Sequence, residues 1–530
     1  MGVSGAIDIT TSQRKTIVGL LKRYLPNVAV WAYGSRVKWT ARPESDLDMV
    51  VFASPEQKKQ VSDMKEALEE SDLPFRVDMF IWDEVPEQFR RNIEAEHVVL
   101  VERQERVVGG GWKCAKFSEL CGIGRGGSPR PIHDFIRESG IPWVKIADAT
   151  SAKTRFIEKT KEFIRPEGIS KSREVFPGDL ILSNSATPGL PMFMSIRACI
   201  HDGWLLLRNF KNIDKLFCYY LLVHERPNIV RYGSGSVFTN LKTDILKNHE
   251  VCIPPLPEQR AIAHILGSLD DKIELNRRMN STLEKMAQTI FKSWFINFDP
   301  VRAKAEGHDP GLPKDIADLF PDSFEDSELG EIPKGWEAST VNAGFDVTMG
   351  QSPPGSTYNE NGHGLPFFQG RRDFGFRYPT KRVYCSEPKR IANVGDTLIS
   401  VRAPVGDINM AYDKCCVGRG VAAVRHKSGS RSFSYYSMRA LGERFSRFEG
   451  EGTVFGSINK KQFDALPFIM PAPSIVEEFE NQVGKLDENM RINTEEIRTL
   501  VCTRDTLLPK LISGELRVPD AEKFVEEASG

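Results

Sequence analysis

The sequence predicts a multidomain α+β protein: an α/β domain at the N-terminus, then two β-rich domains, each followed by a long helix. The two helices are expected to pair as an antiparallel coiled coil. Three observations support this prediction. The 530 residues exceed the roughly 250–300 that one hydrophobic core organises. A long ordered set of motifs occurs twice, and each copy ends in the four-and-three apolar spacing typical of a coiled-coil helix.

Composition is ordinary for a soluble protein, with 40% hydrophobic and 27% charged residues. No apolar run reaches the roughly 18 residues that a membrane helix needs, so no membrane association is expected. The opening MGVSGAIDITTSQRK lacks the apolar core of a secretory signal, which favours a cytoplasmic protein. The nine cysteines include no CxxC pair, and reduced thiols are therefore expected.

The repeat is the strongest structural signal in the chain. Phe238 and Phe455 are 217 residues apart, as are Pro254 and Pro471, whereas Trp112 and Trp336 are 224 apart. The first copy therefore carries about seven extra residues in its middle. The matching blocks are GGSPRP (126–131) with GQSPPG (350–355), PGDLILSNSATPG (177–189) with VGDTLISVRAPVG (394–406), and GSGSVFTNLK (233–242) with GEGTVFGSIN (450–459).

Within each copy, a Gly-Asp turn leads into a strand, PGDLILS or VGDTLIS. A later strand, in NHEVCIPPLP or ALPFIMPAP, is stopped by prolines.

A seam of mostly apolar residues follows each β-rich part. It continues for roughly 33 residues, about 50 Å of helix. A polar residue in such a seam costs stability but can fix register and partner. The alternative, that each helix packs only on its own domain, suits helices of about 12–15 residues. Key seam positions are Ile262, Leu269, Asn276 and Leu283 in the first helix and, 217 residues later, Phe479, Leu486, Asn493 and Leu500 in the second.

Charge is distributed unevenly although the net charge is only −1. The two β-rich segments carry about +7 and +6, and the remaining segments are acidic. Two basic heads on a rigid spacer suit two DNA sites at a fixed separation, and the weaker alternative is a scaffold with protein-binding heads. The expected segments are the N-terminal domain 1–105, the β-rich domains 106–257 and 331–473, the helices 258–298 and 474–515, a linker 299–330 and a tail 516–530.

The start of the first helix, PPLPEQRAIAHILGSLDDKIELNRR (254–278), and the pattern TMGQSPPG…LPFFQGRRD…VGDTLISVRAPVGD of the second copy resemble the specificity subunit of type I restriction-modification enzymes. The resemblance covers about residues 106–517. It implies that each β-rich domain is a target-recognition domain for one half of a split double-stranded DNA sequence. It also implies that the helices form the spacer and dock DNA methyltransferase subunits, two in number, beside a restriction and motor subunit.

That family's specificity subunit is itself non-catalytic. S-adenosylmethionine and ATP would be used only by the partner subunits, and the chain contains no GxxxxGK[ST] loop for ATP.

Arginine and aromatic side chains in short loops are the candidate DNA contacts, because arginine donates to guanine or phosphate and aromatic rings stack or wedge. Glycine-rich GSGS (233–236) and GEGT (450–453) are candidates for backbone contacts to phosphate. The alternative for any one basic residue is a solvated surface charge. The candidates are Lys145, Lys153 and Arg155 in the first copy and Arg371, Arg372, Phe374, Arg377 and Tyr378 in the second.

The first 105 residues have no counterpart in the repeat and alternate helix and strand. Asp46 and Asp48 are two apart on one predicted strand and share a face, and Asp78 lies on another strand. Three such carboxylates suit Mg²⁺, and two ions can activate an attacking group and stabilise a leaving pyrophosphate. Gly34 and Ser35, at a strand end, would present N–H groups and a hydroxyl to a triphosphate.

These residues resemble the minimal nucleotidyltransferase domain of the polymerase-beta-like superfamily over residues 10–102. The resemblance implies that Gly34 and Ser35 bind an NTP and that the three aspartates hold Mg²⁺ and carry catalysis. Val37 and Trp39 are bulkier than the family's usual small residues, which narrows the expected site. The resemblance also leaves open an alternative function, transfer of NMP to a protein or RNA acceptor. In that case the repeat would serve as a DNA-targeting module. A second alternative is an inactive domain retained for docking.

Overall fold

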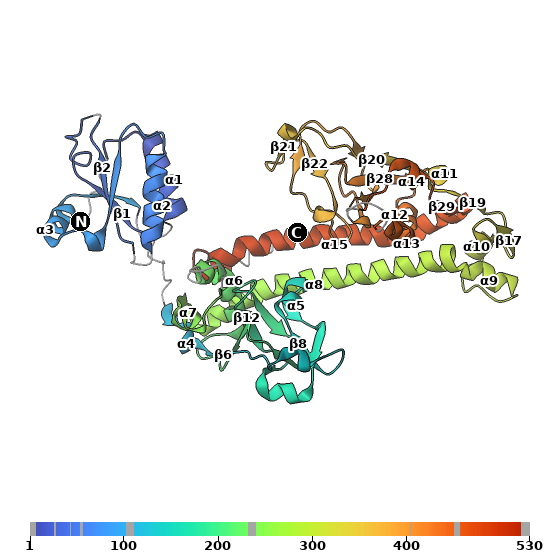
Figure 1. The fold of residues 1–530 in the computed structure, drawn as a ribbon, viewed down its shortest axis with the longest axis horizontal. Coiled ribbons are helices and arrows are strands. Elements are labelled where there is room, and N and C mark those ends of the chain that lie inside the picture. Colours follow the sequence, from blue (N-terminus) through green and yellow to red (C-terminus); the bar gives the residue numbers. More distant parts are fainter. Residues whose placement is uncertain are drawn as a thin grey trace. The chain divides into compact units, whose positions relative to one another are not determined.

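The computed structural model describes residues 7–25, 28–42, 44–53, 57–101, 111–231, 240–402, 404–449 and 456–520 (Figure 1). Contacts divide the chain into two compact units, Met1–Ser268 with Thr503–Gly530, and Leu269–Cys502. In the part of the chain described, no helix has both the length and the apolar character that crossing a membrane requires.

The N-terminal domain is a four-stranded sheet in the order β3-β2-β1-β4. Helices α1 and α2 lie on one side of this sheet and α3 on the other (Figure 1). Thr10 caps α1 through its side chain and forms a capping box with Gln13, which explains why the first helix begins there. The elements are α1 (Thr11–Tyr24), β1 (Val30–Tyr33), β2 (Leu47–Val51), α2 (Lys58–Glu69), β3 (Val77–Ile81), α3 (Glu87–Ala95) and β4 (Val98–Val101).

The first repeated domain has two five-stranded sheets, β11-β14-β8-β10-β7 and β6-β15-β12-β13-β9, and a two-stranded sheet of β5 and β16. Its elements are β5 (Lys113–Lys116), α4 (Phe117–Leu120), β6 (Gly122–Arg125), β7 (Ile136–Arg137), β8 (Ile141–Val144), α5 (Ile146–Ser151), β9 (Phe156–Ile157), β10 (Glu162–Ile164), β11 (Arg173–Val175), β12 (Leu180–Ser183), β13 (Pro191–Met194), β14 (Ala198–Ile200), β15 (Trp204–Arg208), α6 (Lys215–Arg231), α7 (Thr243–Asn248) and β16 (Glu250–Ile253).

The second repeated domain has sheets β20-β28-β25-β26 and β21-β23-β22-β27-β24, and pairs β19 with β29. Its elements are β19 (Glu337–Thr340), α11 (Val341–Gly344), β20 (Phe345–Met349), β21 (Tyr358–Asn359), β22 (Leu365–Phe368), β23 (Tyr384–Cys385), β24 (Ile391–Ala392), β25 (Thr397–Val401), β26 (Val405–Met410), β27 (Cys415–Val417), β28 (Val421–His426), α12 (Arg431–Ala440), α13 (Gly442–Ser446), α14 (Lys460–Asp464) and β29 (Pro467–Met470).

Matching contacts in the two domains explain the repeated Gly-Asp motif. Asp179 accepts from Arg208 Nε at 2.9 Å, and Asp396 accepts from Arg425 Nε at 2.6 Å. Each aspartate also accepts a 2.7 Å bond from a backbone N–H three residues earlier. The motif therefore recurs because its carboxylate ties the turn to a neighbouring strand.

The glycines of the GGSP and GQSP motifs recur for a steric reason. A Cβ on Gly126 would lie 2.1 Å from the carbonyl oxygen of His201, and one on Gly350 would lie 2.1 Å from that of Gly418. Real Cβ atoms do not approach so closely, and only glycine fits either position.

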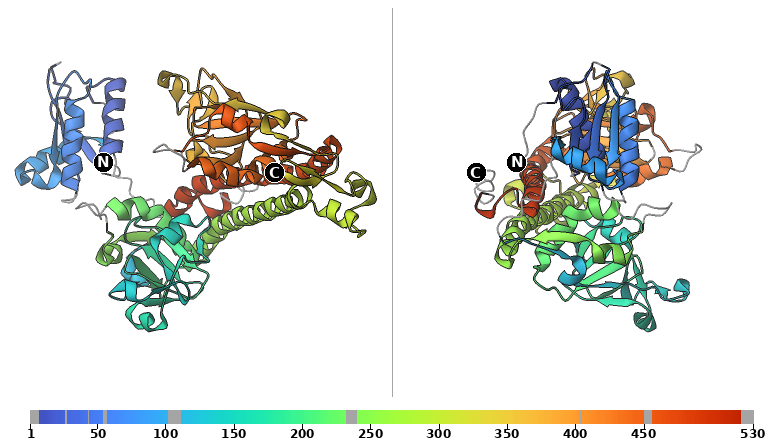
Figure 2. Two further views of the ribbon diagram at one scale, coloured as in Figure 1. Left: turned by 45° about the vertical axis from the view of Figure 1, so that its right-hand side comes forward. Right: turned by 90° about the vertical axis from the view of Figure 1, so that its left-hand side faces the viewer.

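Two long helices follow the repeated domains, α8 (Leu256–Lys292) and α15 (Pro473–Ser513). Figure 2 shows the second repeated domain lying along α15, and their shared core includes Phe433, Phe479 and Val483. Of the predicted seam residues, Ile262, Leu269, Asn276, Phe479 and Asn493 are buried, whereas Leu283, Leu486 and Leu500 are half-buried.

The segment 299–330, expected as a linker, is folded. It contains α9 (Asp299–Ala305), α10 (Lys314–Ala317) and β17 (Phe324–Ser327), which pairs with β18 (Gly330–Pro333). Val301, Ile316 and Phe320 are buried in the core of the second unit, so this segment packs on the domain that it precedes.

The cysteines differ in one respect from the expectation of reduced thiols. Cys114 on β5 and Cys252 on β16 form a disulfide. The two strands are antiparallel, and these residues are direct partners in their register. Their separation of 138 residues explains why cysteine spacing in the sequence did not reveal the pair.

Candidate nucleic-acid interface and nucleotide site

The three predicted acidic residues of the N-terminal domain lie at adjoining strands. Strands β2 and β3 are parallel, with Asp48 directly opposite Asp78, and exposed Asp46 immediately precedes β2. Burial raises the pKa of Asp48, and the charges of Asp78 and Asp46 raise it further. Tyr33, the register partner of Asp48 on β1, has its pKa raised to about 12 by burial and by the charges of Asp48 and Asp78. The three acids therefore share one region of negative potential.

Gly34 brings the backbone directly against this acidic region. Its φ is +84°, and a Cβ there would lie 2.3 Å from Asp48 Oδ2. Any larger residue would therefore displace the carboxylate. Ser35 is the next residue in the turn after β1, so of the predicted nucleotide-binding pair it is Gly34 that lies directly against Asp48.

Buried Arg36 fixes the loop that joins β1 to β2. Its Nε donates to Ser45 O at 2.9 Å and its Nη1 to Asp8 O at 2.9 Å, and the guanidinium lies 3.9 Å from the centroid of the Phe75 ring. Trp39, later in this loop, is 61% exposed with a φ of +57°.

The carboxylates fit a divalent cation in type and placement on the sheet, since Mg²⁺ prefers oxygen ligands. As the side chains stand, however, no three His, Cys, Asp or Glu residues within the described ranges are gathered closely enough to hold a metal ion. Asp78 instead pairs with Arg76, with Nε and Oδ1 3.1 Å apart. Metal binding would require Asp78 to turn from this partly exposed pair.

In the second repeated domain, the loop 369–376 presents several candidate DNA contacts. Arg371 and Arg372 are exposed, and Arg371 pairs with Asp407 at 2.7 Å. Phe374 is half-buried against the core, whereas Phe376 is 47% exposed. The loop therefore offers two guanidinium groups and one aromatic ring to solvent.

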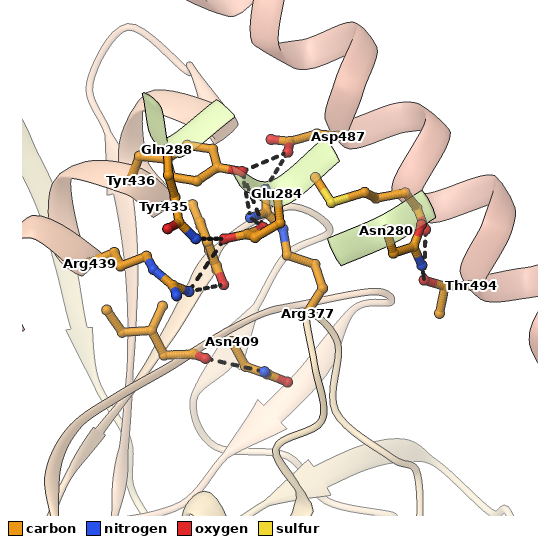
Figure 3. A network of polar contacts seen from close by, with 12 residues as sticks. Asn280, Glu284, Gln288, Arg377, Asn409, Tyr435, Tyr436, Arg439, Asp487 and Thr494 are labelled. Atoms are coloured by element: carbon orange, nitrogen blue, oxygen red, sulfur yellow. Dashed lines mark hydrogen bonds and ion pairs between the residues drawn. The ribbon is translucent and has the colours of Figure 1, made fainter. Parts of the chain in front are cut away.

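Arg377 and Tyr378 correct the prediction that the whole stretch faces DNA. They are only 1% and 8% exposed. Arg377 pairs with Glu284 of α8 at 2.9 Å and with Asp487 of α15 at 2.5 Å (Figure 3). The two carboxylates compensate the loss of water around the guanidinium, so this arginine points into the protein.

In the first repeated domain, Lys145 and Lys153 keep exposed surface, and Lys145 pairs with Glu162. Arg155 is half-buried, and its Nη1 donates to Tyr220 Oη at 3.3 Å and to Gly267 O at 3.5 Å. Arg155 is thus turned toward α6 and α8, and its assignment as a DNA contact stays a prediction. The GSGS (233–236) and GEGT (450–453) loops lie outside the described residues.

The partners of the inward arginines were not predicted from the sequence. Each arginine contacts the second tyrosine of a Tyr-Tyr pair, Tyr220 in FCYY (217–220) and Tyr436 in FSYY (433–436). The two motifs are 216 residues apart. This repeated aromatic pair was a signal available in the sequence, whereas nothing local marks Glu284 or Asp487 as partners.

Comparison with known proteins identifies two parts of the chain. Residues 110–285 match the family model described as type I restriction modification DNA specificity domain. A protein of Methanocaldococcus jannaschii named as the specificity subunit of the type I restriction enzyme MjaX is 30% identical over 431 residues, covering 77% of this chain and 94% of that protein. The crystal structure of a type I restriction-modification S subunit from M. genitalium, 16% identical, covers 78% of this chain and 98% of its own with a TM-score of 0.51, a likeness of fold.

Residues 15–106 match the model of the polymerase beta nucleotidyltransferases. A Haemophilus influenzae protein named as the protein adenylyltransferase MntA is 37% identical over 102 residues, which is 19% of this chain and 90% of that protein. The N-terminal segment is thus a nucleotidyltransferase-family domain joined to a second, unrelated module.

Proposed function

Because the chain belongs to the family of type I restriction enzyme specificity subunits, we propose that its two repeated domains each read one half of a bipartite double-stranded DNA site. The observation that carries this proposal is the duplication itself, since two domains of matching construction each precede a long helix. Both domains have a basic net charge, as a polyanion-binding surface requires.

The spacer in this proposal is an antiparallel coiled coil of α8 and α15. Asn493 Nδ2 donates to Asn280 Oδ1 at 2.9 Å, and Asn276 Nδ2 donates to Glu496 Oε2 at 2.8 Å. Of these two contacts, the one that involves the earlier residue of α8 involves the later residue of α15. This order supports opposite chain directions of the two helices. Paired asparagines in an apolar seam favour one register over its neighbours.

DNA methyltransferase subunits, two in number, are the proposed partners of the helices, together with a restriction and motor subunit. Large apolar side chains exposed on a helix mark interaction surfaces when they cluster. S-adenosylmethionine and ATP enter the complex only with these partners. The exposed residues that support docking are Leu275, Met279 and Met286 on α8 and Ile492 on α15.

Base-modification sequencing of source cells with and without the gene tests the proposal. The expected result is methylation at a motif of two short halves around a fixed unspecified spacer, and its loss on deletion. Unchanged methylation, with the methyltransferase subunit expressed, would contradict the proposal.

For the N-terminal domain, the approach of Gly34 to Asp48 favours a second activity, transfer of NMP from an NTP to a protein or RNA acceptor. Asp46, Asp48 and Asp78 would hold Mg²⁺, and Gly34 and Ser35 the triphosphate. Bound Mg²⁺ supplies electrostatic stabilisation of the departing pyrophosphate. Titration of the full chain with Mg²⁺ and NTP should show saturable binding that Asp48→Asn abolishes. Equal binding by wild type and variant would contradict this assignment.

A further inference from the structure

A buried group of charged side chains joins the candidate DNA loop of the second repeated domain to both long helices (Figure 3). Arg377 directly follows the loop 369–376. Its Nη1 donates to Glu284 Oε2 at 2.9 Å, and its Nη2 lies 2.5 Å from Asp487 Oδ1. Glu284 belongs to α8 and Asp487 to α15, so one side chain links three separate segments.

The surrounding side chains extend this network toward the surface, where the Arg439 side chain is 47% exposed. Arg439 Nη1 lies 3.3 Å from Glu284 Oε1, so two cations face two carboxylates. The Tyr436 hydroxyl lies 3.2 Å from Glu284 Oε2 and 3.4 Å from Asp487 Oδ1, and the Arg377 guanidinium stands 3.5 Å from the Tyr435 ring centroid. The charges cancel within the cluster, which therefore needs no external ligand.

Such a network is a poor way to gain stability, because well-packed apolar side chains of similar volume often stabilise a core equally or better. What distinguishes this network from apolar packing is that its contacts depend on the orientation of the groups that make them. Apolar surfaces tolerate small shifts, whereas the planar guanidinium meets carboxylates from two helices only when their mutual position and that of the loop are correct. The network therefore restricts how the domain sits on the helices.

The first repeated domain has its own inward arginine. Arg155 reaches the Tyr220 hydroxyl and the backbone carbonyl of Gly267 on α8, and Tyr220 is the counterpart of Tyr436 in the repeated aromatic motif. An arginine that ties a domain to its helix thus occurs in both copies, and the second copy adds carboxylates from two helices.

We infer that Arg377 is a positioning residue that sets the orientation of the second repeated domain on the spacer and, through it, the distance between the two DNA half-sites. This inference rests on the proposed function, because it assigns to Arg377 the geometry of recognition. Arg377 acts through Glu284 and Asp487 and makes no contact with DNA.

The test uses the full chain assembled with its methyltransferase subunits and DNA substrates whose two half-sites are separated by different numbers of base pairs. The decisive variant combines Arg377→Met, Glu284→Gln and Asp487→Asn, which removes the directional charges together and leaves no buried charge among these three positions. The measured quantity is the methylation rate at each spacer length relative to the best one. The wild type should show a narrow optimum. For substrates whose spacer is one base pair longer or shorter than the optimum, the relative methylation rate of the triple variant should be at least tenfold higher than that of the wild type.

The matched control is Arg371→Ala, on the surface of the same loop and paired with Asp407. It is expected to change the rates at all spacer lengths by one common factor.

An assembled triple variant with the wild-type spacer profile would overturn the inference. If the triple variant does not assemble, Arg377→Lys decides, because it keeps the charge but lacks the fork that spans two carboxylates. A broadened profile for that variant supports the inference, whereas a wild-type profile, or failure of every variant to assemble, overturns it. A wild type without any spacer optimum would instead contradict the proposed function.

Discussion

Two groups of acidic side chains in this protein differ in how their charge is balanced. In the second repeated domain, Glu284 and Asp487 are buried, and Arg377 lies between them. In the N-terminal domain, Asp48 lies opposite Asp78, and burial, followed by the charges of Asp78 and Asp46, raises its pKa. The first group is neutralised by the chain itself, which is typical of a structural role. The second keeps excess negative charge, which is what a cation-binding site requires before its ligand arrives.

The largest expected effect follows from removing the buried cation alone. Arg377→Met leaves Glu284 and Asp487 buried without their shared partner, and we expect the free energy of unfolding to fall by about 3–5 kcal/mol. Urea unfolding of the full chain, followed by a probe in the second unit, measures the change. A loss below roughly 1 kcal/mol would show that the network is weakly coupled to folding.

A smaller effect, on DNA binding and not on folding, is expected at the exposed end of the same loop. Arg372→Ala should leave stability within about 0.5 kcal/mol of wild type and weaken binding of the target duplex by roughly 1–3 kcal/mol if the guanidinium reads a base. Binding measured at several salt concentrations distinguishes a base contact from a phosphate contact, because only the phosphate contact lowers the salt slope by about one. Unchanged affinity at every salt concentration would remove Arg372 from the interface.

In the N-terminal domain, removing a charge is expected to change the free energy of unfolding in the opposite direction to Arg377→Met. Asp48→Asn removes one of the mutually repelling charges, so the domain should be equally stable or more stable by up to about 1 kcal/mol. Thermal unfolding with a probe in this domain measures the difference. Clear destabilisation would mean that Asp48 is held by stabilising contacts and that the comparison between the two acidic groups fails.

The smallest expected effect is on the pH dependence of the free energy of unfolding. The contributions of Asp48 and Asp179 to this dependence should have opposite signs. Because the pKa of Asp48 is raised, first by burial and then by Asp78, the folded chain holds its proton more tightly than the unfolded chain. Its contribution to stability therefore falls as pH rises from 3.8 to the raised pKa. For Asp179, hydrogen bonds and the charge of Arg208 outweigh burial and lower the pKa, so its contribution is present above 3.8 and is lost as pH falls. Unfolding free energies of Asp48→Asn and Asp179→Asn between pH 3 and about 6 should differ from wild type with opposite slopes, and equal slopes would contradict this account.

Much of the fold was predictable from local patterns. The Gly-Asp turns lead into β12 and β25, and the strands before the proline-rich stops are β16 and β29, because turn chemistry and proline act within a few residues. The long helices follow from apolar periodicity for the same reason. The disulfide between Cys114 and Cys252 was missed because strand pairing over 138 residues is a property of the folded domain.

The candidate sites were predicted less completely. Gly34, Asp48 and Asp78 form one region because adjacent strands carry them. Arg377 was misassigned because an arginine in an aromatic, basic stretch has the local pattern of a surface residue. Its position depends on Glu284, 93 residues away in the chain, and on Asp487 of a different helix, and no short-range pattern encodes those contacts.

The most direct test of the central claim is to replace residues 331–473 with a second copy of residues 106–257 and to map the methylated motif in cells that express the partner subunits. If each repeated domain reads one half-site, the motif should become two inverted copies of the half that the first domain reads, and the half assigned to the second domain should disappear. Methylation that keeps both original halves after the replacement would contradict the account.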